Sequence, residues 1–384
     1  MKYVFNFLII IFYLFFSISV FADWKEEHLK KAISLNGYKL PKEINKNFNT
    51  KKAELGKFIF ENSLLSFNSN TNCQSCHLDT ASSADGLPNA IGVGGKGEGL
   101  ERLKSNGMIV PRNTLPLWGR GGYEFDAFFW DGKVTKKGSK VISQFGSDFP
   151  SDDLLTVAVH LPFVEIREMI TDSDIIREKY KKENLNAAKQ IQEELVNRVK
   201  NKDELLFSYL EAYDIKKLNL KFIHIADSVS HHIRNKFRLR DTKFSKFFEN
   251  KVQLTNDEIE GGLIFYGKGK CSICHNGPHF SDFDYHRIIT PQLGFGRNGF
   301  GIDYGRFNVT FDYDDLYKFR TPPLANVEKT KPYGHSGSLN TLKEMIISHY
   351  DPLSLIDMKN LDPIRRRELF KRISAIENIG VFGA

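Results

Sequence analysis

All four cysteines of this 384-residue chain lie in two Cys-x-x-Cys-His pentapeptides. The pentapeptides are CQSCH, with Cys73, Cys76 and His77, and CSICH, with Cys271, Cys274 and His275. Each one places two thiols at the spacing of the haem vinyl groups, followed by a histidine that can ligate the iron. Zinc ribbons and redox dithiols also contain CxxC pairs, but neither needs a histidine directly after each pair. We therefore predict two covalently bound haem c groups and no disulfide.

The N-terminus supports export to the compartment in which haem c is attached. Lys2 precedes a mostly apolar run over residues 4–21, and Ala22 follows at a position suited to cleavage. The segment 1–22 is therefore predicted to be a signal peptide, and the mature protein to be soluble and periplasmic. The run also approaches the length of a membrane span, so an uncleaved N-terminal anchor is the alternative.

Charge and glycine content exclude two other classes of partner. The formal net charge is +7, Lys and Glu alternate as on solvated helices, and basic patches interleaved with aromatic residues are absent, which argues against nucleic acid. The glycine run over 92–99 has no strand before it and no Gly-Lys-Ser/Thr ending, so it is not a phosphate-binding loop. The length predicts two haem domains, over 23–240 and 241–384.

Helical patterns dominate the chain, and signals for β-hairpins are scarce. Residues 80–122 are rich in Gly, Pro, Asn and Ser and predict a loop packed over a haem. Thr255-Asn-Asp-Glu258 is a capping box that opens a helix leading into the second pentapeptide. The expected helices cover 24–36, 50–62, 173–213, 218–237, 259–265, 341–350 and 363–376. These patterns predict a mainly α protein.

Longer stretches around the pentapeptides resemble the bacterial dihaem cytochrome c peroxidase family, particularly its MauG-like branch. They are VPRNTLPLW, FFWDGK and PFVEIREM in the first half, then GLIFYGKGKCSICHNGPHFSD and KFRTPPLANVEKTKPYGHSGSLNTL in the second. The resemblance covers residues 50 to 355. It implies two cytochrome c-like haem domains that face each other, with a peroxidatic haem in the N-terminal domain and an electron-transfer haem in the C-terminal one.

The same resemblance assigns roles around the first haem. His77 is implied to be the proximal ligand of the reactive iron, and Glu168 to be the distal acid that moves a proton between the peroxide oxygens. Glu165, three residues earlier and expected on the same helical face, is the alternative acid. The family has a glutamine ten residues before the acid, where this chain has Ala158. His160 lies close by in sequence without any sign that it replaces that glutamine.

Two further features follow from the resemblance. Trp130 matches the tryptophan that lies between the haems in the family and relays electrons. Asn113, through its side chain, and Thr330 and Pro332, through their backbone carbonyls, match the ligands of a calcium ion, which prefers such hard oxygens. The chain departs from the family at residue 336, where a serine follows His335 in place of aspartate.

The sixth ligand of the second haem distinguishes the branches. Classical peroxidases place a methionine fourteen residues after the histidine matched by His335, and the MauG-like branch can place a tyrosine there. Here that position is His349, with Tyr350 next to it and Met345 four residues earlier. We predict His349 as the ligand to this iron, with Tyr350, Met345 or no protein ligand as alternatives. His275 supplies the fifth ligand.

Three functions are compatible with this sequence. The first is a MauG-like enzyme that uses hydrogen peroxide to oxidise a protein substrate or redox partner. The second is a classical peroxidase that detoxifies hydrogen peroxide with electrons from a small cytochrome or cupredoxin. The third is a dihaem protein that only transfers electrons. The resemblance implies an open first haem and a distal acid, which favours an enzyme, and the missing methionine favours the MauG-like branch.

Overall fold

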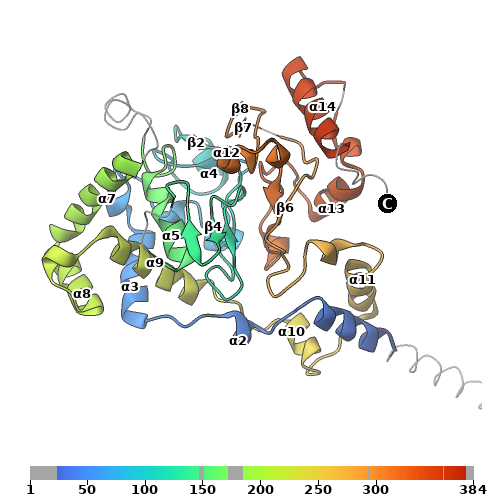
Figure 1. The fold of residues 1–384 in the computed structure, drawn as a ribbon, viewed down its shortest axis with the longest axis horizontal. Coiled ribbons are helices and arrows are strands. Elements are labelled where there is room, and N and C mark those ends of the chain that lie inside the picture. The colour runs from blue at the N-terminus through green and yellow to red at the C-terminus, as the bar shows by residue number, and fades with distance from the viewer. Residues whose placement is uncertain (1–23, 147–150, 172–184, 293, 358, 378–384) are drawn as a thin grey trace, which may run out of the picture. The chain divides into compact units, whose positions relative to one another are not determined.

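The computed structural model describes residues 24–146, 151–171, 185–292, 294–357 and 359–377 (Figure 1). The chain divides into two compact units. The Cys271 unit comprises residues up to 44 and residues 239–282, and the Cys73 unit comprises residues 45–238 and 283 onward. Each unit therefore carries one pentapeptide, and each is described by itself below. The expected signal peptide, over 1–22, lies outside the described residues, and none of the described helices is long and apolar enough to cross a membrane.

The Cys271 unit is built from helices. They are a helix over 24–35, α2 (Pro41–Ile44), α10 (Lys243–Phe248) and α11 (Asn256–Tyr266). The predicted capping box is confirmed at the start of α11, where Thr255 and Glu258 satisfy each other's backbone N–H groups. Helix 24–35 lies against α11 at Gly262, where an added Cβ would come within 2.7 Å of the Leu29 side chain. Buried Leu29, Ile33, Phe247 and Ile259 form the core.

The Cys73 unit contains the other helices and the largest hydrophobic core. Its helices are α3 (Thr50–Glu61), α4 (Leu100–Leu103), α5 (Leu154–His160), α7 (Leu185–Lys200), α8 (Asp203–Tyr213), α9 (Phe222–Lys236), α12 (Phe307–Thr310), α13 (Leu342–Tyr350) and α14 (Pro363–Glu377). The α3 and α9 helices pack closely because Gly56 has no side chain. A Cβ there would lie 1.9 Å from the Ser228 carbonyl oxygen.

Short strands in the same unit brace its loops. All their pairings are antiparallel: β1 (Ala90–Ile91) with β2 (Ile109–Val110), β3 (Ala127–Phe128) with β4 (Val134–Lys137), β4 with β5 (Lys140–Ile142), β6 (Tyr285–His286) with β9 (Phe319–Arg320), and β7 (Phe295–Gly296) with β8 (Gly299–Phe300). The first pair ties together the glycine-rich segment that the sequence predicts as a loop. The fold is mainly α, as expected.

Single-turn 3₁₀ helices connect many of these elements. They are Ser63–Leu65, Cys73–Ser75, Asp79–Ala81, Pro162–Val164, Lys217–Asn219, Cys271–Ile273, Tyr313–Asp315, Val327–Lys329 and Pro352–Leu355. One of them corrects the sequence analysis. The α5 helix ends at His160, and Pro162 opens a 3₁₀ turn two residues later, so Glu165 and Glu168 do not share a helix face. Glu165 is extended, and Glu168 lies in a turn closed by a bridge between Ile166 and Ile170.

Candidate functional site

The two pentapeptide histidines are held in the same way. His77 Nδ1 lies 2.8 Å from the Ser83 carbonyl oxygen, and His275 Nδ1 lies 2.9 Å from that of Phe280. A carbonyl oxygen can only accept, so each Nδ1 carries the proton and donates it. Each Nε2 therefore keeps its lone pair for a metal. This tautomer fits a haem iron ligand at both positions.

The first pentapeptide is fixed by an asparagine that precedes it. The Asn72 side chain accepts from the Ser75 backbone N–H at 2.9 Å, which caps the 3₁₀ turn carrying Cys73. The Cys76 thiol approaches the Ile91 carbonyl oxygen at 3.6 Å. Burial, with Glu168 nearby, raises the pKa of the Cys73 thiol to about 12, so this thiol stays neutral.

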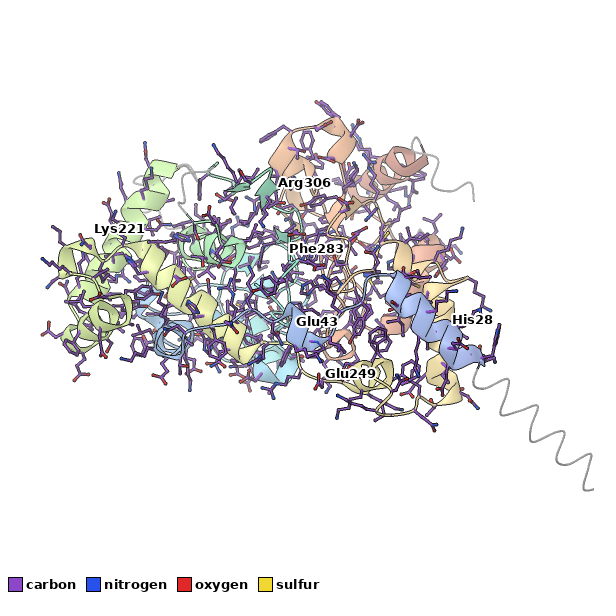
Figure 2. The ribbon with its side chains drawn as sticks, turned by 60° about the horizontal axis from the view of Figure 1, so that its bottom comes forward. His28, Glu43, Lys221, Glu249, Phe283 and Arg306 are labelled. Atoms are coloured by element: carbon purple, nitrogen blue, oxygen red, sulfur yellow. The ribbon has the colours of Figure 1, made fainter. Side chains whose placement is uncertain are left out.

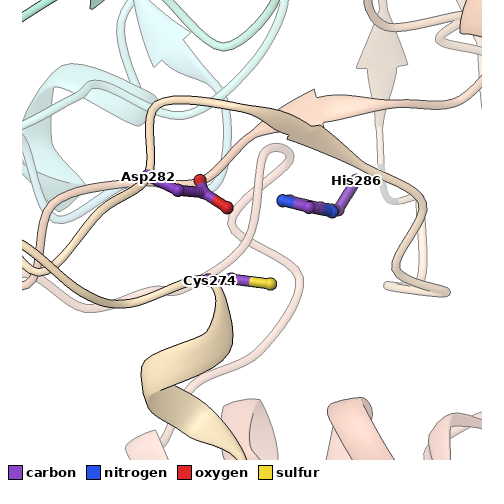
Figure 3. A group of neighbouring side chains, drawn as sticks. All are labelled: Cys274, Asp282 and His286. Atoms are coloured by element: carbon purple, nitrogen blue, oxygen red, sulfur yellow. The ribbon is translucent and has the colours of Figure 1, made fainter. Parts of the chain in front are cut away.

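The second pentapeptide has a different neighbourhood within its own unit. The Asp282 backbone N–H donates to the Cys274 carbonyl oxygen at 2.8 Å, and the Asp282 carboxylate lies within 4.8 Å of the Cys274 sulfur (Figure 3). Aromatic rings gather around Phe280, whose ring centroid lies 5.8 Å from those of Tyr38 and Phe244. Two cysteines followed by a histidine that carries its proton on Nδ1 fit one haem c in each unit.

Glu168 lies within electrostatic reach of the first pentapeptide. Its carboxylate contributes to raising the pKa of both Cys73 and Cys76, after burial, which is the main cause. The turn that carries it is anchored at two backbone hydrogen bonds: Val93 N–H donates to the Arg167 carbonyl at 3.0 Å, and Phe67 N–H donates to the Met169 carbonyl at 2.9 Å. Glu168 is half-buried. It is therefore a fixed carboxylate near the predicted haem attachment.

Glu165 is committed to another partner. It is buried and forms an ion pair with Lys133, which is buried as well. Burial raises the pKa of Glu165, but Lys133 and Arg297 outweigh it and hold this pKa below its usual value. The carboxylate stays ionised and paired. Sequence reasoning missed Lys133, because its partner lies 32 residues away and no charge pattern connects them.

Trp130 is buried in the Cys73 unit and held at both ends. Its indole Nε1–H donates to the Asn113 carbonyl oxygen at 2.9 Å, and its own carbonyl accepts from the Arg320 backbone N–H at 2.7 Å. The next residue, Asp131, is fully buried and pairs with Arg112 at 2.6 Å. Arg112 also reaches Asp303 at 2.8 Å. This network fixes the loop that carries the indole.

The three predicted calcium ligands are buried in the same unit. Asn113 donates its side-chain N–H to the Leu87 carbonyl at 2.8 Å, which leaves its side-chain oxygen for another partner. The Asn113 backbone N–H donates to the His335 carbonyl at 2.8 Å, so the segment carrying Thr330 and Pro332 runs close to Asn113.

The three candidates for the sixth ligand lie on α13. His349 Nδ1 lies 2.7 Å from the Met345 carbonyl oxygen, so it too donates through Nδ1 and keeps a lone pair on Nε2. His349 and Tyr350 are exposed, whereas Met345 is half-buried. Two residues near the expected distal acid lie on α5. Ala158 is buried. His160 donates through Nδ1 to the Thr156 carbonyl at 2.7 Å, and its ring packs against that of Phe222.

Comparisons with known proteins agree on one family. A family model described as di-haem cytochrome c peroxidase matches residues 50–253. The cytochrome c551 peroxidase of Nitrosomonas europaea is 25% identical over 299 residues, covering 78% of this chain and 72% of that protein. The methylamine utilization protein MauG of Methylorubrum extorquens is 23% identical over 305 residues, covering 78% and 68%.

Solved structures give the same fold. A MauG-like protein associated with microbial copper homeostasis aligns with a TM-score of 0.56 at 21% identity, covering 88% of this chain and 92% of that one. The diheme peroxidase BthA from Burkholderia thailandensis aligns with a TM-score of 0.56 at 17% identity, covering 81% and 74%.

Proposed function

We propose, because this chain belongs to the di-haem cytochrome c peroxidase family, that it is a periplasmic haem peroxidase of the MauG-like branch. Each unit holds one haem c, attached through Cys73 and Cys76 or through Cys271 and Cys274. Hydrogen peroxide is reduced at the first pentapeptide, and a protein substrate or redox partner supplies the electrons. The classical peroxidase, which detoxifies peroxide with electrons from a small cytochrome or cupredoxin, is the second candidate.

The position of Glu168 carries this proposal. Reduction of hydrogen peroxide to two waters takes two electrons and two protons, and cleavage of the O–O bond requires a proton to move from one oxygen to the other. The haem iron, when bound, supplies the site at which peroxide is reduced. Glu168 lies within electrostatic reach of both thiols of the first pentapeptide, on a turn anchored to Val93, and can take the proton and return it. Glu165 is less suited to this role, because the ion pair with Lys133 engages its carboxylate and lowers its pKa, so it takes up a proton less readily.

Two other residues support the chemistry. His77, fixed through Nδ1 on Ser83, presents Nε2 as the proximal ligand. The Trp130 indole N–H donates to a backbone carbonyl, which accepts a hydrogen bond but does not readily take a proton. An oxidised indole at this position would therefore keep its proton longer than an indole that donates to a carboxylate. We assign Trp130 the role of electron relay for this reason.

The branch depends on the second haem. A nitrogen ligand such as His349 lowers a haem potential relative to methionine. Its Nδ1 hydrogen bond to the Met345 carbonyl leaves Nε2 in the ligating form. Asn113, Thr330 and Pro332 are proposed as oxygen ligands of a structural calcium ion near Trp130, since the Trp130 indole donates to the Asn113 carbonyl.

The experiment that tests the proposal mixes the fully oxidised protein with one equivalent of hydrogen peroxide in a stopped-flow spectrometer. A MauG-like enzyme should react without prior reduction and should change the absorption of both haems. A classical peroxidase would stay inert until it has been reduced by one electron. A protein that only transfers electrons would not react in either state.

A further inference from the structure

We infer that Arg120 and Arg320 form a carboxylate-binding pair, and that the carboxylate they bind is a propionate of the haem at the first pentapeptide. This inference rests on the proposed function, because it requires haem on Cys73, Cys76 and His77. It goes further by giving Arg120, and Arg320 of the KFRTPPL stretch, a role in holding the cofactor and setting its charge.

The two guanidinium groups lie at one cluster of aromatic rings. Arg120 stands over the rings of Phe125 and Phe128, at 5.6 and 5.7 Å, and Arg320 stands over the ring of Phe283 at 5.6 Å. The Phe125 and Phe283 rings are themselves 4.8 Å apart; Figure 2 labels Phe283. Arg120 is 8% exposed and Arg320 is 1% exposed. Two like charges are therefore buried close together.

Hydrogen bonds hold these side chains in place. Arg320 donates from Nε to the Phe129 carbonyl at 2.8 Å and from Nη1 to the Thr321 carbonyl at 2.9 Å. Arg120 donates from Nε to the Pro116 carbonyl at 2.6 Å, and this is the single hydrogen bond that its side chain makes within the described residues. Within the described residues, its terminal nitrogens Nη1 and Nη2 remain available to bind a carboxylate.

Arg112 is a buried arginine of the same unit whose charge is balanced by carboxylates. It is as buried as Arg120, but it pairs with Asp131 and Asp303, which raise its pKa despite burial. For Arg120, burial and the charge of Arg320 together lower the pKa to about 9. No ion pair joins Arg120 to a carboxylate in the described part of the chain. A buried cation of this kind needs an anion, since an unpaired buried charge is costly.

The position of His77 identifies that anion. The Ser83 carbonyl accepts from His77 Nδ1 at 2.8 Å, and Ser83 Oγ accepts from the Leu117 backbone N–H at 2.8 Å. The Leu117 carbonyl accepts from the Arg120 backbone N–H at 3.1 Å, so the turn that carries Arg120 lies next to the loop that holds His77. A haem ligated by His77 brings its own propionates into this neighbourhood. The planar fork of arginine matches a carboxylate with two parallel hydrogen bonds. The bound haem thus supplies the charge that the protein lacks.

The test measures the reduction potentials of both haems by spectroelectrochemical titration of the intact protein. The titration runs from about pH 5 to pH 9, so that it covers the pKa of a propionate that has lost its cationic partner. Arg120→Gln should lower the reduction potential of one haem at high pH. Ferric iron carries one more positive charge than ferrous iron, so the loss of the nearby guanidinium charge stabilises the ferric form more. The substitution should also make that potential pH-dependent, because a propionate without its partner takes up a proton more easily. Arg120→Lys, which keeps the charge, should restore most of the potential.

Controls separate this inference from the proposed function. Arg238→Gln removes an exposed arginine of the same unit and should leave both potentials unchanged. Haem content is measured first as the pyridine haemochrome; wild-type protein without two haems would defeat the proposed function. Two haems with identical potentials and pH dependence in wild type and Arg120→Gln would overturn the inference alone. A wild-type potential that changes with added chloride or phosphate would also overturn it, since the pair would then bind a free anion.

Discussion

His77 and His275 each donate through Nδ1 to a backbone carbonyl a few residues later, at 2.8 and 2.9 Å, yet their surroundings differ. Near the first pentapeptide the structure places a half-buried carboxylate, Glu168, and the same unit holds a buried ion pair between Lys133 and Glu165. Around the second, within its own unit, it places aromatic rings together with the Asp282 carboxylate, which lies within 4.8 Å of the Cys274 sulfur. The ligand geometry is shared and each pentapeptide has a carboxylate nearby, but the aromatic rings gather at the second.

We propose a division of labour between the two units on the ground of this difference. Breaking the O–O bond needs a group that moves a proton, whereas storing an electron does not. We assign the first role to the Cys73 unit, with Glu168 as that group. The Cys271 unit, with rings of Tyr38, Phe244 and Phe280 near its histidine, is suited to the second.

Removing either pentapeptide should give the largest effect and should break the symmetry between the units. Cys73→Ala with Cys76→Ala should leave one haem per chain and abolish the reaction with peroxide, since the reactive iron is lost. Cys271→Ala with Cys274→Ala should also leave one haem but retain peroxide binding at the other. Haem content and stopped-flow spectra measure both. Equal loss of peroxide binding in the two variants would contradict the division of labour.

Replacing the sixth ligand should change the spectrum of the second haem only. His349→Ala should convert a low-spin signal into a high-spin one in electron paramagnetic resonance, because the iron loses a strong axial ligand. Tyr350→Phe is the matched control and should leave the spectrum alone. Adjacent positions on a helix point about 100° apart, so only one can face the iron. A spectral change in Tyr350→Phe and none in His349→Ala would reverse the assignment.

Replacing the proposed relay should slow electron exchange between the haems without changing either one. Trp130→Phe keeps most of the buried volume but loses the oxidisable indole and its hydrogen bond to the Asn113 carbonyl. We expect two intact haems and slower transfer of an electron from the second to the first in flash-reduction measurements. An unchanged rate would show that Trp130 is only a core residue.

The smallest effect concerns His160, which lies near Ala158 but packs into the core. Burial lowers its pKa to about 4 in the folded state, so between about pH 6.5 and pH 4 the unfolded chain binds more protons. The contribution of His160 to the free energy of unfolding is fully present above pH 6.5. It falls as the pH is lowered, by about 2 kcal/mol between pH 6.5 and pH 5. His160→Gln does not titrate and should flatten that dependence in thermal melts. It should leave the peroxide reaction unchanged; a slower reaction would instead place His160 in the distal site.

Local patterns predict the regular elements of this chain well. The capping box at Thr255 opens a helix as expected, and a second one at Thr341 opens the predicted helix that follows, because each one satisfies backbone N–H groups within four residues. The pentapeptides locate the histidines for the same reason, since ligand and thiols are adjacent in sequence. Family motifs add Glu168 and Trp130, whose positions local chemistry alone does not reveal.

Long-range contacts are what the sequence does not show. The turn at 165–170 was expected to be helical, and it is held instead by Val93 and Phe67, far away in the chain. The Lys133–Glu165 pair and the Arg120–Arg320 neighbourhood likewise join residues with no shared pattern. Burial decides the chemistry of these groups, and burial depends on the complete fold.

Glu168→Gln tests the central claim most directly, with Glu165→Gln as its matched control. Both variants replace a carboxylate by an isosteric amide in the same six-residue stretch, so general damage to the turn affects both. Glu168→Gln should slow the reaction with peroxide by about a hundredfold or more, as expected for loss of an acid–base group, while both haem spectra stay intact. Glu165→Gln should retain most of the rate. A slow Glu165→Gln beside a normal Glu168→Gln would contradict the account.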